Sequence, residues 1–216
     1  MKKLFVVPII MIYLVCASIT FSHAADYRVY TEIGGMGLHE KGISEGHKSY
    51  YLLGTSISTE NIRAKVTGGI EGFILGEAED EDPELLKWGT GIYGEYLYKW
   101  TKFMHPYLGA RFDYWERGSN QKYQDAIQET DFTFASATGG IKFNCGLVYL
   151  NVGTIIPFWT TTQSGNFGAD VGIGISNGEF SIGYHYKEVV FSNHHFEHGD
   201  DDLKFTFSGV ELSYKF

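Results

Sequence analysis

The run VELSYKF, residues 210–216, closes the sequence and decides its fold class. Apolar and polar residues alternate through it with a period of two, which is typical of a β-strand whose faces meet different environments. An aromatic residue stands last, with a second aromatic two positions earlier. The apolar face comprises Val210, Leu212, Tyr214 and Phe216.

The same alternation recurs along most of the chain, most clearly in residues 62–74, 107–115, 167–175 and 180–187. Composition agrees, because the chain has 27 Gly, 16 Phe and 15 Tyr but only 4 Pro. We therefore predict an all-β, closed antiparallel barrel of ten strands. The predicted strands are 27–38, 48–58, 62–76, 88–100, 105–116, 131–143, 147–159, 166–176, 179–191 and 203–216.

Two segments depart from the alternation. Phe205 and Phe207 fall on the face opposite to Val210, and a bulge at Ser208–Gly209 or aromatic packing inside the upper lumen would explain this. Segment 131–143 also changes phase. A barrel of eight strands, with two of the predicted strands forming hairpins in loops, is the alternative.

The connections between the predicted strands alternate between long and short. This asymmetry is typical of bacterial outer-membrane barrels, and it places both chain termini and the short turns on the periplasmic side, with the long loops facing outward. Asn177–Gly178 is a strong signal for a type I′ hairpin. The short connections are 59–61, 101–104, 144–146 and 177–178, and the long ones are 39–47, 77–87, 117–130, 160–165 and 192–202.

The first 24 residues have the features of a secretory signal peptide. Lys2 and Lys3 precede an apolar stretch, and Ser22 and Ala24 supply small residues before a cleavage site. An uncleaved anchor is the alternative, but the apolar stretch is short for a membrane span. We expect residues 25–216 to form the barrel domain, with one cysteine and no internal disulfide.

Charge narrows the range of partners. Without Lys2 and Lys3, the 17 basic residues become 15 against 26 acidic ones, a net charge of −11. Such an acidic protein is a poor candidate for binding nucleic acid, so we expect no nucleic-acid partner. No motif calls for a cofactor, and we expect none.

Alternation alone does not separate a membrane barrel from a soluble one such as a lipocalin. Two features favour the membrane: the polar face carries many small residues, which suit a tight lumen, and aromatic residues gather near strand ends as interfacial girdles do. The predicted girdle residues are Tyr50, Tyr51, Trp88, Trp100, Tyr107, Trp115, Trp159, Tyr214 and Phe216.

With these features in place, the terminal pattern resembles the assembly signal of bacterial outer-membrane proteins. The resemblance extends over the whole chain at the level of architecture and identifies no subfamily. It implies recognition of the last strand by the barrel-assembly machinery, and outer-membrane lipid and lipopolysaccharide as surroundings. The short chain is similar in size to the Ail/OmpX-like adhesion barrels and the omptin proteases.

Charged residues of both signs should project into the lumen. We predict a structural ion-pair network, because an unpaired charge there is costly. A narrow conduction path and a proton-relay or catalytic role are the alternatives, although a barrel this small is largely filled by side chains. The predicted network is Arg28, Glu32, Arg63, Lys65, Glu71, Glu95, Lys99, Arg111, Asp113, Asp170 and Lys187.

Two loops carry weak metal-binding patterns. Residues 77–84 place six carboxylates in eight positions, which suits Ca²⁺ or Mg²⁺ or a simply solvated acidic loop. Segment 192–202 combines imidazoles and carboxylates, which suits Zn²⁺ or Ni²⁺ or a polar surface loop. The candidate ligands of this second loop are His194, His195, His198 and Asp200.

Enzymatic activity is the alternative class. Omptins use acidic residues and a histidine at the outer rim, and lipid A deacylases use a His and a Ser on a lipid-facing strand. His185 and Ser181 share a strand here but on the predicted inner face, and no short motif matches, so we assign no catalytic residue. We predict a non-catalytic outer-membrane barrel with a structural or adhesive role that meets an extracellular ligand through its loops. A narrow channel and a rim-site hydrolase are the alternatives.

Overall fold

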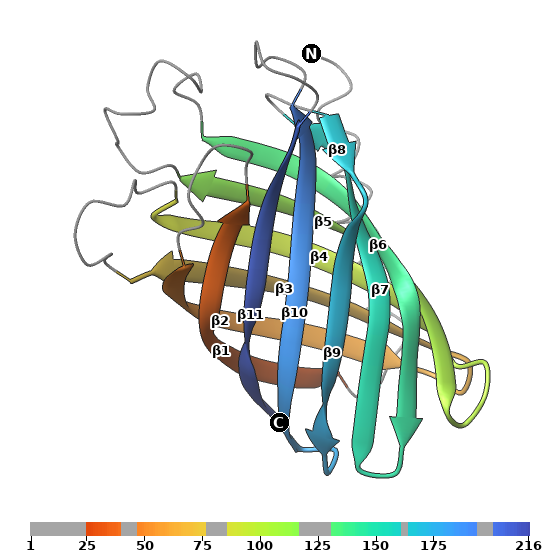
Figure 1. The fold of residues 1–216 in the computed structure, drawn as a ribbon. Helices are drawn as coiled ribbons and strands as arrows, with labels where there is room; N and C mark the ends of the chain where they lie inside the picture. The colour runs from red at the N-terminus through yellow and green to blue at the C-terminus, as the bar shows by residue number, and fades with distance from the viewer. Residues whose placement is uncertain (1–24, 40–46, 77–85, 117–130, 161–163, 194–200) are drawn as a thin grey trace.

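The computed structural model describes residues 25–39, 47–76, 86–116, 131–160, 164–193 and 201–216 (Figure 1). All regular elements among these residues are β-strands, and none of them is a helix capable of spanning a membrane. The strands are β1 (Asp26–His39), β2 (His47–Glu60), β3 (Ala64–Leu75), β4 (Trp88–Tyr98), β5 (Met104–Glu116), β6 (Phe132–Cys145), β7 (Val148–Thr160), β8 (Ser164–Asn166), β9 (Gly168–Ser176), β10 (Phe180–Asn193) and β11 (Asp201–Lys215).

The strands close into a barrel. Consecutive strands pair antiparallel from β1 to β7, β7 pairs with β9, β9 with β10 and β10 with β11. Strand β11 returns to pair with β1 over twelve positions from Arg28–Lys215 to His39–Lys204. Strands β8 and β9 both lie beside β10 and are separated only by Phe167, with one extra residue relative to β10 as in a β-bulge. They therefore count as one, and the described residues form the predicted ten-stranded barrel rather than the eight-stranded alternative.

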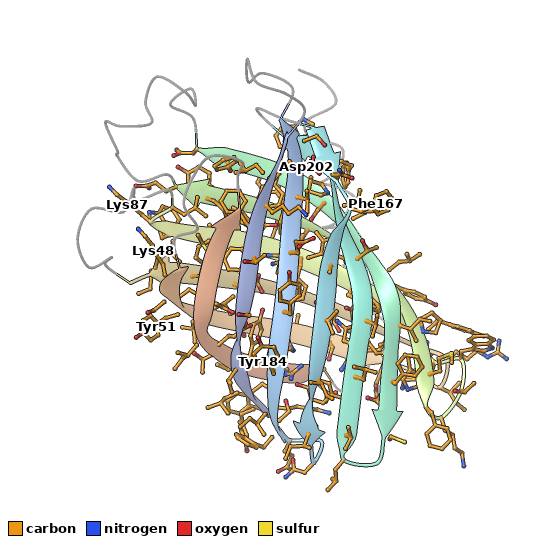
Figure 2. All side chains as sticks on the ribbon, in the orientation of Figure 1. Lys48, Tyr51, Lys87, Phe167, Tyr184 and Asp202 are labelled. Atoms are coloured by element: carbon orange, nitrogen blue, oxygen red, sulfur yellow. The ribbon has the colours of Figure 1, made fainter. Side chains whose placement is uncertain are left out.

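The outer surface of the barrel is apolar. Side chains such as Tyr51 and Phe167 project away from the sheet in Figure 2. Because a soluble barrel would turn these residues inward, this arrangement favours the membrane-type barrel over the lipocalin-like one. Exposed outward residues include Val29, Ile33, Leu53, Ile70, Ile74, Ile92, Leu108, Phe112, Val152, Ile173, Ile175, Ile182, Tyr184, Val210, Leu212 and Tyr214.

The predicted aromatic girdle is only partly correct. Tyr51, Trp88, Trp100, Tyr214 and Phe216 are exposed near strand ends. In contrast, three of the predicted girdle residues are buried inside the barrel, because a strand end has an inward face as well as an outward one. These three are Tyr50, Tyr107 and Trp115.

The change of phase in the apolar alternation of the last strand arises because apolar side chains face the lumen there. Strand β11 pairs with both neighbours without a register shift, so the suggested bulge at Ser208–Gly209 is wrong. Phe205 and Phe207 are buried and face inward on the same side as Glu211. Inward aromatic packing, the second explanation, is confirmed.

Strand β6 also has apolar side chains that face the lumen, and its pairing with the neighbouring strand β7 is irregular. Phe132 and Phe134 are buried inside the barrel. The pairing with β7 shifts by one residue between Ala135 and Ser136, where Phe158 is skipped. The apolar pattern of β6 therefore changes phase where the strand leaves an apolar part of the lumen.

The two ends of the barrel differ as the sequence predicts. The short β6–β7 and β9–β10 turns lie at the same end as the chain terminus at Phe216 (Figure 1). Gly178 has φ of +98°, a conformation that favours glycine, and the side-chain oxygen of Asn177 accepts bonds from the amides of Glu179 and Phe180. We call the end of the barrel that carries these turns and Phe216 the short-turn end, and the opposite end the long-loop end.

Candidate functional site

A cluster of apolar side chains fills the lumen toward the long-loop end. Trp115 lies at its centre, with ring centroids 4.8 Å from Phe134, 5.2 Å from Phe205 and 5.6 Å from Phe207. Its members come from eight strands and from Leu86, which precedes β4. We call it the aromatic plug: Met36, Tyr50, Phe73, Leu86, Trp115, Phe132, Phe134, Ile155, Val189, Phe191, Leu203, Phe205 and Phe207.

The plug is packed as a protein core is packed. Trp115, Phe134 and Phe205 are each 1% exposed, and most of the ring pairs meet edge to face, as aromatic groups prefer. Close-packed interiors contain few voids larger than a water molecule. At this level, the described side chains therefore form a packed core.

Between the plug and the short-turn end, the lumen holds a polar cavity of about 560 Å³. The cavity is bounded above by plug residues, including Phe73, Trp115 and Phe207, and extends to Glu179 and Lys215 at the short-turn end. Its walls carry charged, hydroxyl and amide groups. Water and small polar solutes fit its chemistry.

The most buried charged group on the cavity wall centres on Arg111 of β5. Its Nη2 lies 2.6 Å from both Glu71 Oε1 and Asp113 Oδ1. The Tyr30 hydroxyl donates to Glu71 Oε2 at 3.0 Å, and Lys187 Nζ lies 3.7 Å from Glu71 Oε1. These contacts join β1, β3, β5 and β10 across the lumen, just below the plug.

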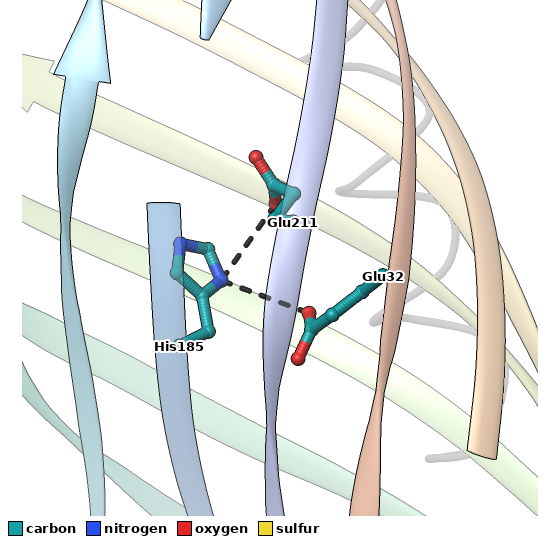
Figure 3. A group of neighbouring side chains, drawn as sticks. All are labelled: Glu32, His185 and Glu211. Carbon is teal, nitrogen blue, oxygen red and sulfur yellow. Dashed lines mark ion pairs between the residues drawn. The ribbon is translucent and has the colours of Figure 1, made fainter. Parts of the chain in front are cut away.

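A second group gathers where β10, β11 and β1 meet (Figure 3). His185 Nδ1 lies 3.8 Å from Glu32 Oε2 and 3.7 Å from Glu211 Oε2. Tyr50 donates to Glu32 Oε1, and Arg28 Nη2 lies 3.2 Å from Glu211 Oε1. We call Glu32, His185 and Glu211 the lumen triad, because these three side chains have the donor types needed to hold a metal ion.

Further ion pairs lie nearer the short-turn end. Lys142 Nζ lies 2.7 Å from Glu95 Oε1 and 4.8 Å from the centre of the Tyr107 ring, and the Tyr107 hydroxyl donates to Asp170 at 3.4 Å. Two more pairs join Lys99 to Glu60 at 3.1 Å and Lys215 to Asp26 at 2.8 Å. The cavity wall thus carries fixed charges of both signs along its length.

Ten of the eleven predicted lumen residues face the interior. Nine line the cavity, and Asp113 lies buried behind Arg111. Arg63 is the exception: it is exposed in the turn before β3, because this strand begins at Ala64, two residues later than predicted. The nine are Arg28, Glu32, Lys65, Glu71, Glu95, Lys99, Arg111, Asp170 and Lys187.

The sequence prediction missed several lumen residues, including Lys142 and Glu211. Both alternate with outward apolar residues, so strand periodicity alone would have placed them inside. The grouping of His185 with two glutamates is different in kind. It depends on which strands are neighbours and on their register.

Several predicted sites lie outside the described residues. They include the signal peptide, residues 1–24, and the acidic segment 77–84. His194, His195, His198 and Asp200 also lie there, so their proposed metal site stays a prediction. The outward set Val210, Leu212, Tyr214 and Phe216 is described and lies exposed on the outer surface.

Comparison with solved structures identifies the fold. The outer membrane protease OmpT from Escherichia coli matches with a TM-score of 0.51 and 7% identity, covering 91% of this chain and 100% of that one. Neisserial surface protein A matches at 12% identity, covering 90% and 100%, with a TM-score of 0.41. The chain has an outer-membrane β-barrel fold.

Ail, the attachment invasion locus protein of Yersinia pestis, is also similar to this outer-membrane β-barrel, at 11% identity, 89% and 99% coverage and a TM-score of 0.37. No protein-family model matches the sequence, and no curated protein matches it. At such low identities the similarity concerns the fold alone. An outer-membrane β-barrel implies the bacterial outer membrane as its location.

Proposed function

We propose that this outer-membrane β-barrel is a closed, non-conducting anchor that presents its long-loop segments at the cell surface for interaction with an extracellular ligand. The observation that carries the proposal is the aromatic plug. A core packed around Trp115 gives ions no hydrated path through the long-loop end. The proposal assigns no catalytic step to the chain.

Surface interaction is supported by the asymmetry of the connections. The ends of strands that flank residues 40–46, 77–85, 117–130, 161–163 and 194–200 lie at the long-loop end (Figure 1). The acidic segment 77–84 is one of these connections. We therefore propose a ligand with positive charge, whose binding weakens as salt screens the attraction.

The outer surface accounts for the other proposed partners. Exposed apolar residues suit the acyl chains of outer-membrane lipid and lipopolysaccharide. The exposed face of the last strand, including Leu212 and Phe216, supports recognition by the barrel-assembly machinery during insertion.

Conductance tests closure. Barrel purified from outer membranes is reconstituted in planar lipid bilayers, with a general porin as the positive control. We expect no stable current steps. Steady ohmic conductance would contradict the proposal and support the narrow channel, the function that the polar cavity favours.

Cell-surface binding tests the loops. Cells displaying the native chain are compared with cells displaying a variant whose six carboxylates in residues 77–84 are replaced by amides. We expect the native chain alone to retain a fluorescent oligolysine peptide, and salt to release it. Equal retention by both variants would contradict the assignment of this segment.

Hydrolysis is tested separately. Incubation with peptides and with lipopolysaccharide, followed by mass spectrometry, should leave both intact. Cleavage by the native barrel would overturn the non-catalytic assignment and support a rim-site hydrolase.

A further inference from the structure

The lumen triad sets two carboxylates directly against each other. Glu32 of β1 and Glu211 of β11 are register partners, and both face the lumen. Like charges placed directly opposite on neighbouring strands destabilise a sheet. Both residues are buried, at 7% and 8% exposure, so solvent screens this repulsion poorly.

Each carboxylate is held at one oxygen and has the other turned toward the imidazole. The hydroxyl of Tyr50 holds Glu32 Oε1, and the guanidinium of Arg28 holds Glu211 Oε1. The two Oε2 atoms lie 3.8 and 3.7 Å from His185 Nδ1, which is beyond normal hydrogen-bond length. The imidazole therefore stands within ion-pair distance of both carboxylates but forms a hydrogen bond with neither.

The two distances from His185 Nδ1 are slightly longer than the spacing of donors around a bound metal ion. Zinc binds nitrogen and oxygen at about 2.0–2.2 Å, so two ligands of a tetrahedral ion lie about 3.4 Å apart. The three donor atoms of the lumen triad all lie within 4.8 Å of one another. Binding a shared ion would therefore draw the two glutamate side chains closer to the imidazole.

We propose that the lumen triad binds one divalent first-row transition metal ion, with Zn²⁺ as the reference ion, through Glu32 Oε2, Glu211 Oε2 and His185 Nδ1. A mixed imidazole and carboxylate set suits this class of ion. Tyr50 and Arg28 act as outer-shell groups that orient the two carboxylates. Three protein ligands leave coordination positions for water from the cavity.

Two glycines make the room for this arrangement. A Cβ at Gly172 would lie 2.9 Å from His185 Nε2, and a Cβ at Gly209 would lie 3.0 Å from Glu32 Oε1. The strand positions beside the triad therefore carry no side chain that would separate its members. The imidazole and one carboxylate pack directly against backbone.

Metal titration of the purified barrel in detergent tests the proposal. After removal of bound metal with a chelator, Zn²⁺ binding is measured by calorimetry and Co²⁺ binding by visible absorption. We expect one tight site per chain in the native barrel. The triple variant His194→Ala, His195→Ala, His198→Ala should keep this site, which separates it from any site in segment 192–202.

Variants of the triad should lose the site. We expect no tight site in His185→Ala, and at least about tenfold weaker binding in Glu211→Gln, which keeps the shape of the side chain. His105→Ala is the matched control, because His105 lines the same cavity outside the triad. A heat-dependent shift in gel migration verifies that each variant is folded.

Three results would overturn the proposal. They are the absence of a tight site in the native barrel, a site that survives His185→Ala, and a site lost in the triple variant. In each case His185 serves only as an ion-pair partner of the glutamates. Bilayer conductance is measured independently of metal binding. If the metal-binding proposal fails, the proposed closure of the barrel is still tested by conductance.

Discussion

On the long-loop side of Glu71 and Arg111, most inward side chains of the barrel are aromatic or aliphatic, with Asp113 and Ser136 as buried polar exceptions. From Glu71 and Arg111 to the short-turn end, the inward side chains are mostly charged, hydroxyl-bearing or glycine. Large apolar side chains are exposed on the outside of strands β1 to β5, β7 and β9 to β11, as expected of a surface that faces lipid. The inward side chains can differ between the two levels because they contact only one another. Toward the long-loop end they are stabilised by close packing, and toward the short-turn end by ion pairs around a cavity of about 560 Å³.

The plug and the cavity have different proposed roles in the barrel. In the proposed function, the plug closes the long-loop end, whereas the charged cavity has space for water or an ion. We therefore expect losses in the plug to cost stability and to open a path. Losses in the cavity should change charge balance or binding, with the barrel still closed.

The largest effect is expected at Trp115. Replacing it by alanine removes the central ring of the plug, which is 1% exposed, and should lower the free energy of unfolding by about 3–5 kcal/mol. Urea titration in detergent micelles measures this change. Trp100→Ala is the matched control, because Trp100 is 64% exposed on the outside. Equal losses for both variants would contradict the description of the plug as a packed core.

The next largest effect is expected at Arg111. Its replacement by alanine leaves Glu71 and Asp113 without their guanidinium partner, which typically costs 3–5 kcal/mol when the group is fully buried. Water from the cavity reaches Arg111, so we expect about 2–4 kcal/mol in the same titration. Lys99→Ala breaks a more exposed pair and should cost less than about 1 kcal/mol. The reverse order would refute the ranking.

A moderate effect is expected at Gly209. A methyl group there would lie 2.8 Å from the Tyr50 hydroxyl and 2.7 Å from the Ile33 carbonyl oxygen. We expect Gly209→Ala to cost about 1–3 kcal/mol through overpacking. Gly35→Ala places its methyl in open space and serves as the control. Identical unfolding curves for the two variants would show that the close contact at Gly209 is unimportant.

The smallest effect on stability is expected at Phe216. It is 69% exposed and contacts the ring of Tyr214, so its deletion should change the unfolding of refolded barrel by less than about 1 kcal/mol. In cells, however, the deletion should reduce the heat-modifiable fraction in outer membranes, whereas Phe216→Tyr should not. Normal insertion of the deletion variant would contradict the proposed assembly signal.

The sequence predicted the outward face better than the inward one. Outward residues such as Leu53 and Ile173 all face the same apolar environment, so their period of two predicts the strands directly. Phe205 and Phe207 interrupted the pattern because the plug places apolar residues inside. Trp115 was assigned to the girdle for the same reason.

The lumen charges could be predicted singly but not in their groups. Lys65 and Asp170 follow from alternation alone. The lumen triad needs the closure of β11 on β1 and the register that puts Glu32 opposite Glu211. Nothing local in the sequence fixes that register, because it is set jointly by all the strands of the closed barrel.

We propose that the aromatic plug, and not the ion pairs around Arg111, closes the barrel. Single-channel recording in planar bilayers tests it by comparing Phe205→Ala, Phe207→Ala double-variant barrel with Arg111→Ala, each first shown to be folded by gel migration. We expect current steps for the aromatic double variant and no current for Arg111→Ala. Silence of the double variant together with conduction by Arg111→Ala would contradict it.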